Sequence, residues 1–81
     1  MKIKLSYTGY LKLVGARNGD IVEVPEGASI SDVMTQFGIP AHQQRHLIPF
    51  VNGDEQRKLN TSLNDGDELT LVIQIGGGSA G

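Results

Sequence analysis

The most apolar strand pattern in this sequence comes last, and that order constrains the fold more than any other feature does. From Glu68 to Ile75, hydrophobic residues alternate with polar or β-branched residues, which is the period of a strand. One face of this strand is entirely aliphatic, carrying Leu69, Leu71, Ile73 and Ile75. Such a strand needs partners on both edges and cover on at least one face. We therefore expect the last strand to lie in the centre of a sheet.

The N-terminal part of the chain predicts two strands joined by a long loop. Residues 2–7 alternate polar with apolar side chains, and residues 21–24 are rich in β-branched types after the turn dipeptide Asn18-Gly19. Between them, residues 10–14 are too short for a stable helix, so we expect a helical turn or an ordered loop whose leucines and valine lie under the core. The two strands should form an antiparallel hairpin.

One helix is expected, over residues 30–37. Ser29 can cap its first turn, Asp32 stands where the acid of a capping box would, and Gly38 suits the position after the last turn. Pro40 prevents the helix from continuing. The side chains spaced to form one apolar stripe are Ile30, Val33, Met34 and Phe37. This stripe predicts that the helix covers one face of the sheet.

The chain after this helix predicts one further strand and a short one. Residues 41–46 are polar and irregular, whereas residues 47–51 are apolar and run into the turn dipeptide Asn52-Gly53. Pro49 has no N–H to donate, which places this strand toward an edge of the sheet or bends it. A short polar segment, residues 54–59, follows, and a short strand between residues 47–51 and the last strand completes the set.

The order strand, strand, helix, strand, short strand, strand predicts an α+β fold: a mixed sheet of four or five strands with one main helix packed on one face. Two arrangements fit this order. One is a ubiquitin-like β-grasp, in which the first and last strands pair in parallel at the centre, and the other is an antiparallel meander. Only the β-grasp explains why the most apolar strand comes last. We expect one domain over residues 1–75 and a flexible glycine-rich tail over residues 76–81.

Composition excludes several classes of site and partner. The 81 residues include no cysteine, so a disulfide, a cysteine–zinc site and a thiol nucleophile are all excluded. The net charge of −2, without a basic run, disfavours binding to nucleic acid. No stretch approaches the roughly 18 apolar residues of a membrane span. We therefore expect a cytoplasmic protein that binds neither nucleic acid nor a membrane.

The side chains of the chain suggest no catalytic centre of its own. His42 and His46 are spaced by one helical turn, but no third ligand accompanies them, so we interpret them as part of a solvated loop. Asp65, Asp67 and Glu68 lack the spacing of a calcium loop, and we expect them to stabilise a turn instead. No glycine-rich phosphate loop is present. We expect no metal and no cofactor to be bound by the chain itself.

Five segments carry a further pattern in their order and spacing: Met1–Leu5, Tyr10–Gly15, Val24–Met34, Val51–Gly53 and Leu63–Leu69, followed by a glycine-rich end. Together they resemble the MoaD/ThiS-type sulfur carriers, the group of the molybdopterin-synthase small subunit and the thiamin sulfur carrier. The family has a β-grasp fold, in agreement with the strand order. At Val72–Gln74 the molybdopterin-type members often have prolines, so the resemblance is to the family and not specifically to its molybdenum branch.

The resemblance implies a function for the C-terminal end. In the family, the segment between the Asp-Gly-Asp turn and the terminal diglycine has a nearly fixed length, which places the diglycine at Gly77 and Gly78. Ser79–Gly81 are then an extension, which a protease would have to remove. The freed carboxylate would be adenylated and converted into a thiocarboxylate, a sulfur donor for cofactor or metabolite biosynthesis.

In this reading the chain is a carrier and a substrate, not an enzyme. Its partners would be an adenylating enzyme of the ubiquitin-activating type, which supplies the ATP, and a sulfur-accepting synthase, with the free carrier a monomer. The composition of the tail alone favours a flexible linker. The alternative function is therefore a noncatalytic ubiquitin-like interaction or modifier module with a disordered tail.

A docking surface is expected on the sheet. If Val51 points into the core, alternation sends Ile48 and Phe50 outward. These two side chains, with Gly76 at the start of the tail, would form the kind of surface that β-grasp carriers present to adenylating enzymes. A register shifted by one residue would instead make Phe50 part of the core.

Overall fold

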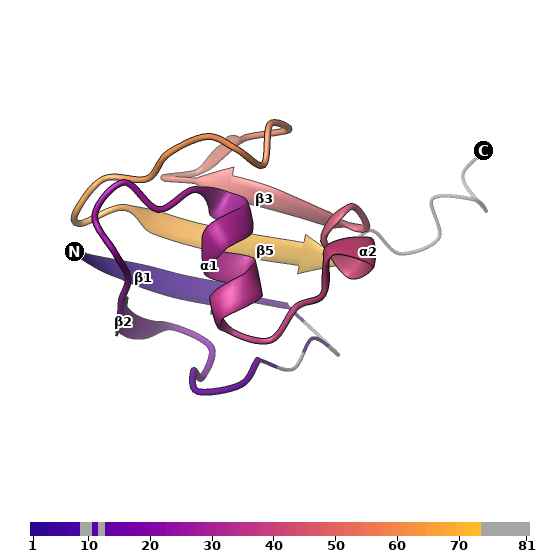
Figure 1. Cartoon of the computed structure of the whole chain (residues 1–81), viewed down its shortest axis with the longest axis horizontal. Coiled ribbons are helices and arrows are strands. Elements are labelled where there is room, and N and C mark those ends of the chain that lie inside the picture. The colour runs from indigo at the N-terminus through magenta and orange to yellow at the C-terminus, as the bar shows by residue number, and fades with distance from the viewer. Residues whose placement is uncertain (9–10, 12, 74–81) are drawn as a thin grey trace.

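Five strands form a single sheet in the order β2-β1-β5-β3-β4 (Figure 1). The computed structural model describes residues 1–8, 11 and 13–73 of the chain. The elements are β1 (Lys2–Tyr7), β2 (Asp20–Glu23), α1 (Ile30–Gln36), α2 (Ala41–Gln44), β3 (Leu47–Val51), β4 (Asp54–Glu55) and β5 (Glu68–Ile73). The last strand lies in the middle of the sheet, as its apolar pattern predicts. Residues 74 and 75, which we also expected in this strand, lie outside the described residues.

Strand β5 is parallel to β1 and antiparallel to β3. Leu5 pairs with Leu69 on one side, and Pro49 pairs with Leu71 on the other. Parallel neighbours need a crossover connection, and α1 supplies it by lying across one face of the sheet (Figure 1). The parallel pairing of the first and last strands confirms the β-grasp and excludes the antiparallel meander.

Helix α1 begins as the sequence predicts. The Ser29 hydroxyl accepts a hydrogen bond from the Asp32 N–H at 3.1 Å, and the Asp32 carboxylate accepts one from the Ser29 N–H at 2.9 Å. This capping box satisfies two N–H groups that the first turn leaves without helical partners. The helix ends at Gln36, one residue before the predicted end, and Phe37 serves as its C-cap.

The core lies between α1 and the sheet. The predicted apolar stripe of the helix faces strands β1 and β5, whose inward side chains are equally buried. The largest fully buried side chains are Ile3, Leu5, Ile30, Val33, Met34, Leu69 and Leu71. Burial of one such side chain contributes roughly 1.5–3 kcal/mol, so the loss of any one removes a large share of the stability of a small domain.

Residues 41–44 form the short helix α2, not the irregular segment that the polar pattern predicts. The reason is Gln44, whose side chain is only 3% exposed. Its Oε1 accepts a hydrogen bond from the Ser31 hydroxyl at 2.7 Å, and its Nε2 donates to Thr35 Oγ1 at 2.9 Å and to the Ile39 carbonyl at 3.0 Å. A polar side chain is stable in the interior when its donors and acceptors have hydrogen-bond partners. The hydrogen bonds of Gln44 to Ser31 and Thr35 connect α2 to α1.

The loop between β1 and β2 differs from expectation at one residue. The two leucines of segment 10–14 pack partly against the core, whereas positions 10 and 12 lie outside the described residues. Val14 is 73% exposed. The backbone of Val14, and not its side chain, contacts the end of α1, because the Val14 N–H donates to the Phe37 carbonyl at 2.9 Å. The Val14 side chain covers Gly38, where a Cβ would lie 2.9 Å from Val14 Cγ2.

The acidic residues before β5 form a turn, as the sequence predicts. The Asp65 carboxylate accepts a hydrogen bond from the Lys2 N–H at 2.7 Å, and the Asp67 carboxylate accepts one from the Asn64 N–H at 2.8 Å. Gly66 adopts a φ of +86° and donates its N–H to the Lys2 carbonyl at 2.8 Å. These contacts tie the turn to the start of β1 and so place β5 beside it.

Candidate functional site

The sheet face opposite α1 carries the residues predicted to dock a partner. Along β3, Leu47 and Pro49 are buried, while Ile48 and Phe50 are only partly buried and do not join the core cluster. Successive residues of a strand point to opposite faces, which explains this pattern. Phe50 therefore lies outside the core. The role of Ile48 and Phe50 in docking remains a prediction.

Strand pairing adds a third apolar side chain to this face. Ile48 of β3 pairs with Val72 of β5, and Phe50 pairs with Thr70 in the same register. Directly paired residues on one face have Cβ atoms about 4.5–5.5 Å apart. Val72 is also partly buried without packing against the core cluster. We call Ile48, Phe50 and Val72 the outer patch.

Polar groups border the outer patch on the β1 side. Lys4 pairs with Glu68 in the parallel register, and its Nζ lies 4.0 Å from Glu68 Oε2. Both side chains are about half exposed, so this ion pair contributes little to stability. An apolar centre with a charged, solvated rim is the ordinary composition of a protein interface.

The outer patch lies at the end of the strand that leads to the predicted reactive glycines. Val72 is followed by Ile73, the last residue of β5. Gly76, Gly77 and Gly78 lie outside the described residues, so the structure adds nothing to their prediction. What it shows is that the strand connected to them carries one side chain of the outer patch.

The two histidines do not form a metal centre. His42 lies on α2 and His46 lies beyond its end, and both side chains are exposed. Among the residues that the structure describes, no three His, Asp or Glu side chains are grouped closely enough to hold a metal ion.

Sequence reasoning missed Val72 as part of the candidate surface. Alternation along β5 places Val72 on the outer face, but only the pairing with β3 sets it opposite Ile48. The available signal was an aliphatic residue between Thr70 and Gln74 on the polar side of an otherwise regular strand.

Solved structures with the same arrangement of elements support this view of the fold. SAMP1 from Haloferax volcanii is 23% identical, with a TM-score of 0.68 over 95% of this chain and 99% of the other. The second is a complex of subunits 1 and 2 of the molybdopterin-converting factor from Helicobacter pylori 26695. It is 16% identical, with a TM-score of 0.60 over 90% of this chain and 93% of the matched chain. These likenesses show a shared ubiquitin-like fold.

Two further findings bear on classification. A comparison with curated proteins gave no significant match. Neither helix in the described part of the chain has the length and apolarity needed to cross a membrane. The sequence pattern of the ThiS family, however, matches residues 7–78 and so covers most of the chain. This chain belongs to the ThiS family of small carrier proteins.

Proposed function

We propose that the protein is a sulfur carrier whose C-terminal Gly78 is adenylated and then converted into a thiocarboxylate. The observation that carries this proposal is the ThiS-family match, which extends through the glycines to residue 78. The outer patch on β3 and β5 supports it, because its residue Val72 lies near the end of β5, the strand that precedes these glycines in the sequence.

The chemistry requires a free carboxylate. An oxygen of the Gly78 carboxylate attacks the α-phosphate of ATP, pyrophosphate leaves, and the acyl-adenylate forms. A hydrosulfide then attacks the acyl carbon and AMP leaves, which yields the thiocarboxylate. If the attacking sulfur is a persulfide, an acyl disulfide forms first and a thiol reduces it. Because ATP and sulfur come from partners, the carrier needs only a terminus of the right shape, and glycine fits a narrow channel since it has no Cβ.

The reach of the tail determines where the activating enzyme must sit. Residues 74–78 follow the end of β5, and at about 3.3–3.6 Å per residue they span at most roughly 18 Å. The active site of the enzyme must therefore come within that distance of Ile73. The outer patch begins at the neighbouring Val72, so an enzyme that receives the tail is within reach of this surface.

The extension Ser79–Gly81 gives the proposal a sharp test. In the full chain, the Gly78 carbonyl carbon is part of an amide, which does not react with ATP. We expect a chain that ends at Gly78 to support ATP–pyrophosphate exchange by an adenylating enzyme of the ubiquitin-activating type from the same genome, and the 81-residue chain to support none until a protease trims it.

A matched variant separates chemistry from folding. Gly78→Ala in the shortened chain adds one methyl group and should slow exchange without changing the melting temperature, because a glycine has no side chain that could pack into a core. Equal exchange by the 81-residue chain, with its mass unchanged, would place the reactive terminus at Gly81. It would refute the proposal that Ser79–Gly81 block activation.

The second candidate is a noncatalytic interaction or modifier module. The molybdopterin-converting factor from Helicobacter pylori was solved as a complex of two subunits, which supports a protein partner for this fold and is compatible with either candidate. Intact mass of the protein recovered from its host distinguishes the two. A form ending at Gly78 with one oxygen replaced by sulfur supports the carrier, whereas uniformly full-length, unmodified protein supports the module.

A further inference from the structure

A pocket of about 250 Å³ opens beside β3, on the side of the strand that faces β4. Leu47, Pro49 and Leu59 give it apolar walls, and the exposed side chains of Arg45 and Arg57 stand at its edge. Pockets that hold whole small molecules usually measure ~300–1,000 Å³. This one has the size to accept a single apolar side chain.

The backbone next to this pocket has an unused sheet edge. The Gln56 N–H donates to the Pro49 carbonyl at 2.8 Å, so the odd-numbered residues of β3 turn their backbone groups away from β5. Strand β4 pairs only with Phe50 and Val51. Among the described residues, nothing bonds to the Leu47 N–H or carbonyl on that side. An extended peptide could use these groups as an added strand does.

The charges around the pocket are mostly positive. Arg45 and Arg57 line it, and the one acidic residue lining it is Glu55, whose Oε2 lies 3.0 Å from Arg57 Nε. The Arg57 side chain is 88% exposed, so its remaining N–H groups are open to a further acceptor. The overall charge of the chain is −2, which makes this a local excess of positive charge. Such a rim is complementary to carboxylates.

We propose that this pocket binds an extended acidic segment of a protein partner, with one apolar side chain inserted between Arg45 and Arg57. In an extended segment, residues two positions apart share a face, so carboxylates two residues before and after the inserted side chain would reach the two guanidinium groups. Ile48 lines the pocket and also belongs to the outer patch. The segment therefore continues the same contact surface around the edge of the sheet.

The identity of the partner as the adenylating enzyme rests on the proposed function, whereas the chemistry of the segment does not. The first test thus needs no enzyme. We would titrate the isotope-labelled full chain with acetyl-Glu-Ser-Leu-Ser-Glu-amide and follow amide resonances by NMR. Matched peptides carry Gln or Lys in place of both Glu residues. We expect saturable shifts centred on the Leu47 amide and the Gln44 side-chain amide for the Glu peptide, weaker shifts for Gln, and none for Lys.

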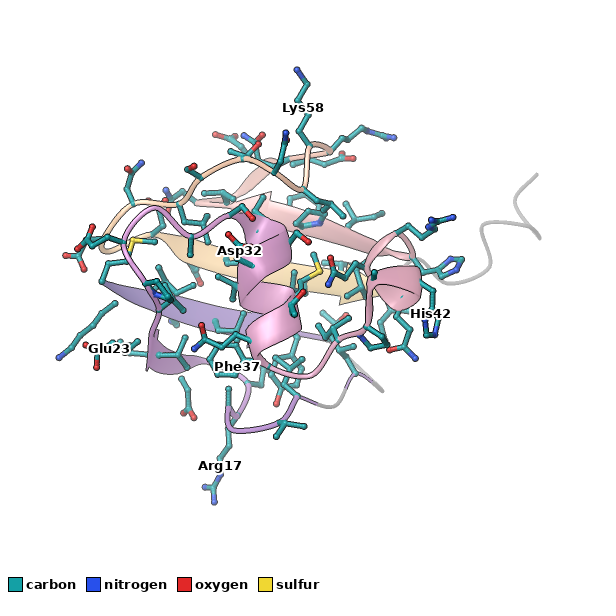
Figure 2. All side chains as sticks on the ribbon, in the orientation of Figure 1. Arg17, Glu23, Asp32, Phe37, His42 and Lys58 are labelled. Atoms are coloured by element: carbon teal, nitrogen blue, oxygen red, sulfur yellow. The ribbon has the colours of Figure 1, made fainter. Side chains whose placement is uncertain are left out.

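Two neighbouring charge reversals provide the matched pair of variants. Arg57→Glu should weaken binding of the Glu peptide roughly tenfold, the usual size of a lost charge-assisted contact. Lys58→Glu makes the same change in net charge, but Lys58 does not line the pocket and extends away from the sheet (Figure 2). It should change the affinity less than about twofold, because exposed charges at a distance are screened. Both variants should keep the melting temperature of the parent.

Several results would overturn the proposal: no saturable shift, shifts confined to Phe50 and Val72, equal binding of the Lys peptide, or equal effects of Arg57→Glu and Lys58→Glu. A second measurement connects the pocket to the enzyme. In pyrophosphate exchange with the chain ending at Gly78, Arg57→Glu should raise the KM and Lys58→Glu should not. If no form supports exchange, the proposed function fails, while the peptide titration still decides whether the pocket binds an acidic segment.

Discussion

Asn52 and Asp67 join the two turns that flank the C-terminal strands. The Asn52 Nδ2 donates to Asp67 Oδ1 at 3.0 Å, and the Asn52 Oδ1 accepts from the Glu68 N–H at 2.9 Å. Asn52 has a φ of +53°, the single positive value among the described non-glycine residues. Asparagine tolerates this conformation better than most residues, so one side chain forms the turn after β3 and also fixes the start of β5.

Replacement of Asn52 should separate these two contributions. We expect Asn52→Ala to lower the free energy of unfolding by ~1–3 kcal/mol, because it loses both side-chain hydrogen bonds and strains a backbone with positive φ. Asn52→Gly loses the same bonds without the strain, so it should cost less. Urea denaturation of both variants measures the difference. Equal losses of unfolding free energy in the two variants would show that strain at the positive φ of position 52 does not affect stability.

Leu71 in β5 should be among the most sensitive core positions. It is 1% exposed, and its truncation leaves a cavity between the sheet and α1. We expect Leu71→Ala to lower the free energy of unfolding by ~2–5 kcal/mol. Val72→Ala, one residue along on the outer face, is the matched control and should cost far less. A loss below ~1 kcal/mol for Leu71→Ala would contradict its assigned place in the core.

Gln44 should contribute about as much to the free energy of unfolding as an apolar core residue does. Gln44→Leu keeps a side chain of similar size but leaves the Ile39 carbonyl and the Ser31 hydroxyl without their partner. We expect a loss of ~1–3 kcal/mol in the free energy of unfolding. Gln43→Leu changes the exposed neighbour and should be nearly neutral. Thermal melts of the two variants test this, and similar melting temperatures would mean that the buried hydrogen bonds do not stabilise α2.

Phe50 should matter for binding and little for folding. We expect Phe50→Ala to shift the melting temperature only slightly and to weaken binding to the proposed adenylating enzyme, since partly exposed aromatic residues often anchor interfaces. Ile21→Ala is a suitable control: Ile21 is 71% exposed and pairs with Lys4, so it lies on the same face but on the far strand β2. If both variants bind equally well, or if Phe50→Ala unfolds the domain, the outer patch is not the docking surface.

Much of the fold could be predicted because periodicity and turn chemistry are local properties. The aliphatic face of residues 68–73 indicated a central strand, and Ser29 with Asp32 marked the start of α1. The short helix α2 could not be predicted, since its one buried residue is a glutamine whose partners lie in α1 and at Ile39. Val14 was wrongly expected under the core, because composition does not reveal that its backbone, and not its side chain, meets α1.

The candidate surfaces were only partly predictable, for a related reason. Alternation along β3 indicated that Ile48 and Phe50 share a face, which is a property of one segment. Val72 joins them only through the pairing of β3 with β5. Arg45 and Arg57 come together only because the chain reverses at Asn52-Gly53, so no pattern within either segment indicates their shared pocket.

The position of β5 also determines when the protein can fold. Lys4 pairs with Glu68, which lies far along the sequence, and neither β1 nor β3 has both of its neighbouring strands until β5 has been made. On the ribosome, the nascent chain before β5 would therefore hold a hairpin, a helix and a β3 that is paired only with the short β4, with apolar faces that nothing yet covers. Closing so long a loop is slow compared with local helix formation. Folding should thus wait until β5 has been made and has left the ribosome, and the chain should be a substrate for chaperones in the interval.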